Sequence, residues 1–141
     1  CALPILALMA GAMLVGFKRD FVPLLDPTAL SLRTPALATF ARSNTKPDEV
    51  LLGFGLGFSS EVPYYATRRA MLLSDYVPAA GLRKMHDDPN SYLGGYPLGM
   101  VIVCANQLTL QQETARDAAA LLEQVTANRT RYRVAGCDVY R

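Results

Sequence analysis

Apolar residues fall into short continuous runs along this chain of 141 residues, and glycine, proline and charged residues separate the runs. Parallel strands that are buried on both faces show such unbroken runs, whereas strands with one wet face alternate apolar and polar residues. We therefore predict buried strands at 50–54, 69–73 and 100–105, followed by two β segments at 130–136 and 137–141.

Apolar residues between the strands recur at helical spacing. Thr34 and Pro35 have the residue types of an N-cap and a first helical position, so a helix is expected to begin there. We also predict short helices at 60–67 and 79–86, and a capping box at 109–112 opens the helix with the clearest apolar face. Alternating strands and helices predict a small layered α/β domain with a mostly parallel sheet of about four to five strands, flanked by helices.

The first seventeen residues contain no charged side chain, and Lys18 and Arg19 then follow. A helix of this length would rise about 25 Å, slightly less than the hydrocarbon core of a bilayer. We predict that residues 1–17 are the end of an apolar, membrane-like helix, that 18–33 form a connector and that 34–141 form a soluble domain. A signal peptide, which carries its basic residues before the apolar run, and a buried core helix are the alternatives.

The composition excludes some classes of function. The net charge of +2 is too small for a dedicated nucleic-acid-binding protein. The single histidine and the three cysteines show no spacing that resembles a metal site, so we expect neither a metal nor a cofactor. Cys104 ends one apolar run and Cys137 begins the last β segment. If those strands are neighbours, an oxidising compartment would allow a disulfide between them; two separate half-buried thiols are the alternative.

Three glycines follow the first predicted strand. Gly53, Gly55 and Gly57 resemble the turn that admits a pyrophosphate in dinucleotide-binding domains, and Asp75 ends the next strand, where an acid would hold a ribose. The last glycine of that motif is missing, and Pro63 leaves only a short helix to face a phosphate. A structural turn, in which glycine supplies positive φ and close packing, is the alternative. The letters GLGF also occur in a carboxylate-binding loop of peptide-binding domains, but Pro63 would interrupt the strand that such a loop requires.

A longer stretch, PDEVLLGFGLGFSSEVPYYATRRAML at 47–72, resembles a segment of the C-terminal soluble domains of bacterial polytopic membrane glycosyltransferases. Those enzymes are similar to dolichyl-phosphate-mannose protein mannosyltransferases and aminoarabinose lipid A transferases. The ending AGCDVYR, at 135–141, resembles the terminus of the same domains. Phe58 stands where those domains carry tryptophan, and this chain has no tryptophan. The resemblance covers roughly residues 47–141.

The resemblance implies a function that the chain would not perform alone. In that family the sugar comes from a polyprenyl-phosphate donor and is transferred by inverting displacement, with the essential acids near the N-terminal membrane helices. The chain would then be a non-catalytic lid or wall of the active site, on the extracytoplasmic (periplasmic) side of a bacterial inner membrane. Its partners would be its own upstream transmembrane domain, the lipid-phosphate-linked sugar and the membrane. A soluble nucleotide-binding module that uses the Gly53–Gly57 turn and a membrane-tethered interaction domain are the alternatives.

Tyr64, Tyr65, Arg68 and Arg69 are the residues that we expect to contact a substrate or the membrane domain. If the short helix continues through them, one tyrosine and one arginine share each of two neighbouring sides. An arginine beside a tyrosine hydroxyl suits a phosphate or sugar phosphate, because the guanidinium offers charge and forked donors. The alternative is structural, with an arginine stacked on a tyrosine or paired with a nearby carboxylate.

Two further groups of charged residues attract attention. Arg129, Arg131 and Arg133 would share one strand face, where they would contact anionic lipid headgroups or protect a sheet edge from further pairing. His86 lies beside Asp87, but neighbours in sequence point in different directions on a helix. We therefore interpret His86 as a surface residue at a helix end.

Overall fold

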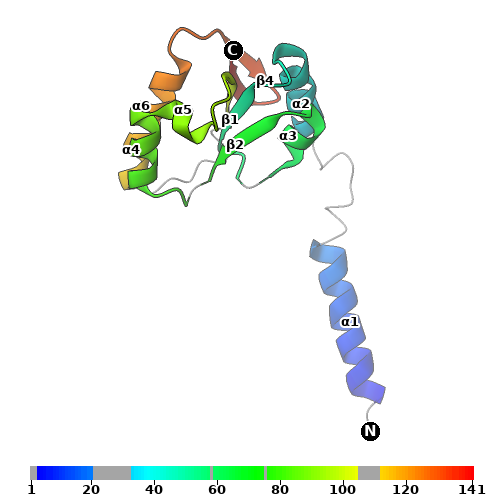
Figure 1. Cartoon of the computed structure of the whole chain (residues 1–141). Coiled ribbons are helices and arrows are strands. Elements are labelled where there is room, and N and C mark those ends of the chain that lie inside the picture. Colours follow the sequence, from blue (N-terminus) through cyan, green and yellow to red (C-terminus); the bar gives the residue numbers. More distant parts are fainter. Residues whose placement is uncertain (1–2, 21–32, 58, 75, 105–111) are drawn as a thin grey trace. The chain divides into compact units, whose positions relative to one another are not determined.

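The computed structural model describes residues 3–20, 33–57, 59–74, 76–104 and 112–141 (Figure 1). Contacts between residues divide the chain into two compact units, Cys1–Arg33 and Thr34–Arg141. The first unit holds a single described helix, α1, and the second holds the sheet.

The first unit contains α1, which runs over Leu3–Asp20. Large apolar side chains are exposed along it: Met9, Met13, Leu14, Val15 and Phe17. The predicted helix therefore forms, but the prediction that it is membrane-like is not supported. Among the described residues, no helix combines the length and the apolar character that crossing a membrane requires. Lys18 and Arg19 lie in the last turn of α1, so charge falls inside its eighteen residues.

The second unit is built on a five-stranded sheet with the order β2-β1-β3-β5-β4. Its strands are β1 (Val50–Phe54), β2 (Arg69–Leu73), β3 (Leu98–Val103), β4 (Arg131–Val134) and β5 (Cys137–Tyr140). β1 pairs in parallel with β2 and β3, whereas β5 pairs antiparallel with β3 and β4. The prediction of a mostly parallel sheet is therefore wrong, because two of the four pairings are antiparallel.

The antiparallel pairing of β4 with β5 follows from their short connection. Only Ala135 and Gly136 join the two strands, and both have positive φ, of 48° and 81°. Two-residue hairpin turns with positive φ match the twist of a sheet. A parallel crossover would need about a dozen residues, so the chain must reverse direction here.

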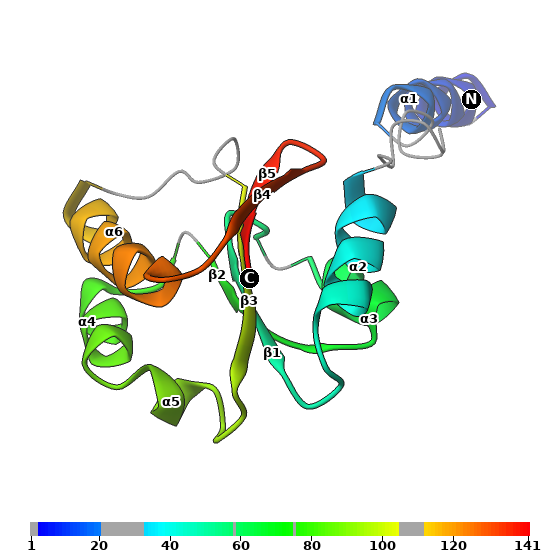
Figure 2. The ribbon, with the colours of Figure 1, turned by 90° about the horizontal axis from the view of Figure 1, so that it is seen from above.

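Helices cover both faces of the sheet (Figure 2). On one face lie α2 (Arg33–Asn44) and α3 (Glu61–Ala66), and on the other lie α4 (Ala79–Asp87), α5 (Pro89–Tyr92) and α6 (Gln112–Thr126). Successive strand residues point to opposite faces. Leu51 and Ile102 pack in the core layer beneath α2 and α3, whereas Leu52 and Val101 pack in the layer beneath α4 and α6. The predicted α/β class, with a sheet flanked by helices, is confirmed.

Most predicted elements have nearly the predicted bounds, and two differences concern helices. The helix predicted over 60–67 ends at Ala66, because Thr67 adopts a left-handed conformation with φ 54° and ψ 45°. The single turn α5, for which no helix was predicted, follows Asp88, and the Asp88 side chain caps it. Thr109, the first residue of the predicted capping box, lies outside the described residues.

Candidate functional site

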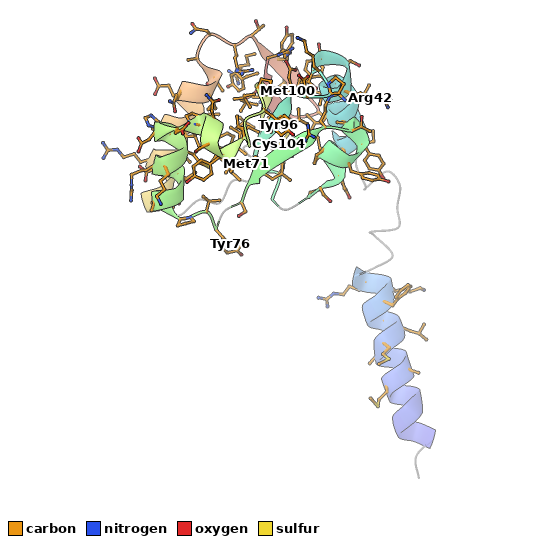
Figure 3. The ribbon with its side chains drawn as sticks, viewed as in Figure 1. Arg42, Met71, Tyr76, Tyr96, Met100 and Cys104 are labelled. Atoms are coloured by element: carbon orange, nitrogen blue, oxygen red, sulfur yellow. A yellow bond between two sulfur atoms is a disulfide. The ribbon has the colours of Figure 1, made fainter. Side chains whose placement is uncertain are left out.

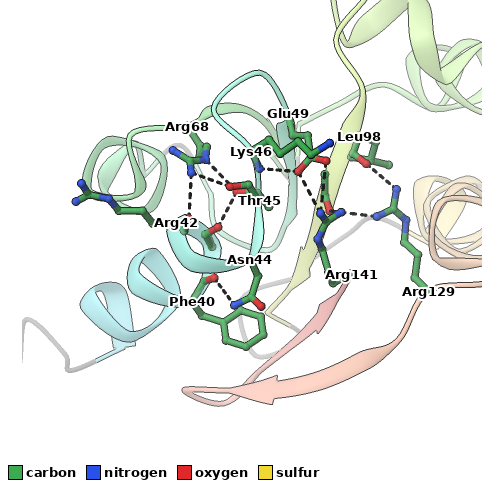
Figure 4. Close-up of polar contacts among 12 residues, drawn as sticks. Phe40, Arg42, Asn44, Thr45, Lys46, Glu49, Arg68, Leu98, Arg129 and Arg141 are labelled. Atoms are coloured by element: carbon green, nitrogen blue, oxygen red, sulfur yellow. Dashed lines mark hydrogen bonds and ion pairs between the residues drawn. The ribbon is translucent and has the colours of Figure 1, made fainter.

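Arg68 joins the C-terminal ends of two helices. At α2, Nη2 donates to the carbonyl oxygens of Arg42 (3.0 Å) and Thr45 (2.7 Å), and Nε donates to the Thr45 hydroxyl (3.0 Å). At α3, Nη1 donates to the carbonyl oxygens of Ala66 (3.3 Å) and Thr67 (3.1 Å). Figure 4 shows the contacts with α2. Every nitrogen of the guanidinium has a protein partner. Arg68 therefore has a structural role, although its partners are helix-end carbonyl groups and a threonine hydroxyl, not the tyrosine ring or carboxylate that the sequence suggested.

Arg69 begins β2 and lies against an aromatic ring. Its guanidinium carbon is 4.0 Å from the centre of the Tyr96 ring. A guanidinium over an aromatic face is attracted by the negative potential of that face. Tyr96, labelled in Figure 3, comes from the segment just before β3. Since α3 ends before both arginines, the predicted helical pairs of tyrosine and arginine do not form.

Tyr64 and Tyr65 lie on the exposed side of α3. Their exposed fractions are 75% and 59%. Their ring centres are 5.3 Å apart and their planes meet at 77°, which is an edge-to-face pair. Val62 and Ala66 are the buried residues that hold α3 against the sheet. The two tyrosines therefore contribute little to the core and are accessible to a partner.

A wide hollow of about 650 Å³ lies on the surface between the end of α3 and the start of β2. Its lining residues are Pro47, Ser60, Pro63, Tyr64, Thr67, Arg68 and Arg69. Three of the four predicted site residues thus meet in one place, and Tyr65 is not among the lining residues.

Packing and backbone conformation explain the glycine turn after β1. A Cβ atom on Gly53 would lie 2.7 Å from Cδ2 of Leu72 and 2.9 Å from Cδ1 of Leu56. Gly55 and Gly57 have positive φ, of 68° and 59°. Residues with a Cβ rarely adopt such conformations. Packing or backbone conformation therefore explains why glycine occupies each of these positions, and no ligand is needed to explain it.

The same turn nevertheless lies where open α/β sheets bind ligands. β1 has β2 on one side and β3 on the other, and α3 and α6 cover opposite faces (Figure 2). The carboxyl ends of two such strands form a topological switch point. Two features argue against a phosphate site here. α3 has only six residues, and the Ser60 side chain makes no capping hydrogen bond. Asp75, the predicted ribose ligand, lies outside the described residues.

Cys104 and Cys137 form a disulfide, with 4.5 Å between their Cα atoms. The bond connects the end of β3 to the start of β5 in the core beneath α2, and both residues have an exposed fraction of 0%. Figure 3 labels Cys104. Disulfides persist in oxidising compartments and are rare where thiols are kept reduced.

A second polar cluster lies where β1 and β3 begin (Figure 4). Glu49 is buried, accepts a hydrogen bond from the backbone N–H of Lys46 (2.8 Å) and lies 3.5 Å from Nη2 of Arg141. Arg129 and Arg141 both donate to the carbonyl oxygen of Gly99, at 3.2 and 3.1 Å. Burial, and then the positive charge of Arg141, lower the pKa of Arg129. Neither Glu49 nor Arg141 belongs to a motif or a candidate site that the sequence predicted.

Arg131 and Arg133 are exposed on β4, and both bind Asp138 of β5 at 2.7 Å. Hydrogen bonds from Arg133 and Arg131 lower the pKa of Asp138. Arg129 precedes β4 and donates to the Leu98 carbonyl oxygen (2.8 Å), so the three arginines do not share one strand face. The charged pair on β4 fits protection of an edge strand, and contact with lipid stays a prediction.

The other candidate chemistry receives little support from the geometry. His86 is exposed, and its Nδ1 lies 3.7 Å from Oδ1 of the adjacent Asp87. Within the described ranges, no cluster of histidine, cysteine, aspartate or glutamate could hold a metal ion.

Comparisons with protein-family models, with curated proteins and with solved structures find no match to this chain. The candidate site therefore rests on its own geometry. Tyr64, Arg68 and Arg69 are among the residues that line the hollow between α3 and β2.

Proposed function

We propose that this chain is the extracytoplasmic C-terminal domain of a bacterial membrane glycosyltransferase-like protein. The parent protein would use a polyprenyl-phosphate sugar donor, and this domain would be a lid or wall of the active site without catalysing transfer itself. The buried disulfide between Cys104 and Cys137 carries most of the proposal, because it favours an oxidising compartment such as the periplasm.

Two further observations support the proposal. The stretch at 47–72 that resembles the transferase domains contains β1, α3 and most of β2, and hydrogen bonds from Arg68 connect it to the end of α2. The large apolar side chains that are exposed on α1 would be covered by another part of the parent protein. Tyr64 and Tyr65, exposed on α3, would face that membrane domain or its substrate.

The reading frame that contains this sequence in its genome provides the first test. About ten or more apolar spans upstream, with acidic residues in the first outer loop, would support the proposal. A signal-like start with no further spans would overturn it.

A transfer assay then tests the role of the domain. Membranes that contain the parent protein would receive a radiolabelled polyprenyl-phosphate sugar, and transfer to the acceptor would be counted. We expect Tyr64→Ala/Tyr65→Ala to reduce transfer at an unchanged protein level, and the exposed Arg116→Ala on α6 to leave it unchanged. Transfer by the chain on its own would show that the proposed non-catalytic role is wrong.

A soluble nucleotide-binding module is the second candidate, and one observation favours it: the Gly53–Gly57 turn lies at the topological switch point between β1 and β3. This candidate requires that NAD or a similar dinucleotide raises the melting temperature, and that Asp75→Ala abolishes the shift. A membrane-tethered interaction domain would show neither the nucleotide effect nor a transferase upstream.

A further inference from the structure

β2 and β4 are the two edge strands of the sheet, and they differ in charge. On β4, Arg131 and Arg133 are exposed and bind Asp138 of the neighbouring strand. Charged residues on an edge strand discourage a further strand from pairing with it. β2 has the sequence RAMLL, in which Arg69 at the start is the only charged residue. Charge therefore protects the edge at β4, whereas the four residues that follow Arg69 on β2 carry none.

The edge of β2 is free within the part of the chain that the structure describes. There β2 pairs with β1 alone, in parallel from Arg69 to Leu73, and lies at one end of the sheet (Figure 1). An edge strand presents unpaired N–H and C=O groups to a further strand. Met71 and Leu72 are half-buried, so each side chain keeps some surface for further contact. The free edge thus offers backbone hydrogen bonds and apolar side chains together.

The faces of β2 define how a second copy of the same strand would pair with it. Ala70 and Leu72 pack against the core beneath α2 and α3, whereas Met71 and Leu73 pack in the core beneath α4 and α6. Residues directly opposite each other in an antiparallel pair lie on the same face of the sheet. Only one antiparallel register of two β2 strands keeps the faces together and uses all five residues. It places Met71 opposite Met71 of the second copy.

This register brings compatible side chains together. Ala70 lies opposite Leu72 of the second copy, so a small residue faces a large one. Arg69 lies opposite Leu73, and the two arginines are about 13 Å apart along the strands, which is more than the screening length at 0.1 M salt. A parallel pair in register would instead place the two arginines side by side, where like charges repel. The charge pattern therefore favours the antiparallel pair.

We infer that β2 is the docking edge for a second copy of this chain, with a two-fold axis at Met71 and one sheet continuous across both copies. Such an interface is self-complementary, because both copies use the same patch. The sheet already contains antiparallel pairing, between β3 and β5. Five strand residues make a small interface, so the dimer is weak, with a dissociation constant in the micromolar range. The inference does not depend on the transferase assignment.

Sedimentation equilibrium of the full chain in a density-matched neutral detergent tests the inference. We expect the wild type to show a monomer–dimer equilibrium at micromolar concentrations. Met71→Lys places two ammonium groups opposite each other and should raise the dissociation constant by about tenfold or more, because like charges directly opposite are destabilising. Tyr132→Lys adds the same charge to the exposed edge strand β4 and should leave the dissociation constant unchanged.

A charge-swap pair identifies the residue on the axis. Met71→Glu alone should weaken the dimer as Met71→Lys does, and an equimolar mixture of the two variants should recover it, because lysine then faces glutamate. Circular dichroism shows that each variant is folded. A wild type that stays monomeric throughout the micromolar range would overturn the inference. A dimer that neither Met71 variant weakens would also overturn it, because the contact would then lie elsewhere in the chain.

Cross-linking extends the test to the case in which a charge at position 71 prevents folding. Directly opposite residues of antiparallel strands have Cα atoms about 4.5 or 5.5 Å apart, within the range of disulfides. In a Cys1→Ser background, Met71→Cys should therefore form a cross-linked dimer on mild oxidation, seen by non-reducing gel electrophoresis. Tyr132→Cys on β4 is the control and should stay monomeric. Equal cross-linking of both variants would show random collision and would count against the docking edge.

Discussion

The Arg68 guanidinium lies 2.7 Å from the carbonyl oxygen of Thr45, a residue 23 positions earlier in the chain. Thr45 in turn donates its hydroxyl to the carbonyl oxygen of Ala41 at 2.6 Å. The last carbonyl groups of a helix have no partner inside the helix, and the helix dipole makes that end negative. Arg68 therefore supplies both donors and positive charge where α2 needs them.

We expect Arg68→Ala to lower the free energy of unfolding by about 2–3 kcal/mol, because several charge-assisted hydrogen bonds are lost and the buried Thr45 loses a partner. Arg68→Lys should recover little of this loss, because an ammonium group cannot reach both helix ends with forked donors. Urea denaturation followed by circular dichroism measures both values.

Arg42→Ala is the matched control for this prediction. The Arg42 side chain is exposed, and only its backbone carbonyl oxygen binds Arg68, so the change should stay within about 0.5 kcal/mol. A double-mutant cycle with Thr45→Val isolates the contact between the two side chains. Fully additive losses would show that the Arg68–Thr45 pair is not the source of the stability.

Gly99→Ala should destabilise the domain more than Gly53→Ala. A Cβ atom on Gly99 would lie 2.6 Å from Cβ of Glu49, which is fixed to the backbone, and the Gly99 carbonyl oxygen also accepts hydrogen bonds from two arginines. At Gly53 the close atoms are the far ends of two leucine side chains, which can rotate away. We expect a loss of about 1–3 kcal/mol at Gly99 and a smaller loss at Gly53.

We expect the opposite effect, a gain in stability, from Gly81→Ala in the same domain. Gly81 lies in α4, and the nearest atom to an added Cβ is 3.5 Å away, which is ordinary contact. Alanine in a helix should raise stability by about 0.5–1 kcal/mol relative to glycine. Chemical denaturation of the three variants gives the comparison, and an equal effect at Gly53 and Gly99 would contradict the packing argument.

Local sequence patterns predicted the elements of this fold better than their pairing. The apolar runs of β1 and β2 have the predicted bounds. β1 is buried at all five positions, and β2 keeps a continuous apolar run although it is a partly exposed edge strand. The direction of β5 depends on the turn at Ala135 and Gly136, in which both residues have positive φ. The predicted segments at 130–136 and 137–141 leave no room for a parallel crossover, so the reversal between β4 and β5 followed from the short connection. The antiparallel pairing of β5 with β3 has no such local signal.

The sequence predicted which residues form the candidate site but did not predict how they are arranged. Tyr64 and Arg69 do line one hollow, but the helix that was expected to align them ends at Thr67. The N–H groups of Thr67 and Arg68 bind the carbonyl oxygens of Tyr64 and Pro63, which is a Schellman ending that usually contains glycine. Contacts of Arg68 with α2 stabilise this ending from a distance. No pattern within a single segment reports such a long-range contact.

The disulfide leads to two predictions, one about the number of reactive thiols and one about the stability of the chain. The chain has three cysteines, so one reactive thiol per chain, that of Cys1, is expected under denaturing conditions without reductant, and three after reduction. Cys104→Ala/Cys137→Ala should lower the free energy of unfolding by about 3 kcal/mol, because the unfolded chain loses a constraint. Thiol titration with a chromogenic reagent gives the count. Three reactive thiols before reduction would show that the bond is absent.

From the lowered pKa of Asp138 we predict how the stability of the domain depends on pH. Its pKa is below the ordinary value of 3.8, because the carboxylate accepts hydrogen bonds from Arg133 and Arg131. A carboxyl group whose pKa is lower in the folded state binds fewer protons there than in the unfolded chain. Its contribution to stability is therefore fully present above the unfolded pKa and is lost as the pH falls through the folded pKa.

We expect the wild type to lose stability between about pH 5 and pH 2 more steeply than Asp138→Asn, because the variant has no proton to take up at this position. Urea midpoints measured at half-unit steps of pH give the two curves, which should converge at the acid end. Arg131→Gln/Arg133→Gln removes both donors and should show the same shallow curve as Asp138→Asn. High salt should reduce the difference, because the pair is exposed on its arginine side. Parallel curves for all three proteins would show that the Asp138 carboxylate does not couple folding to pH.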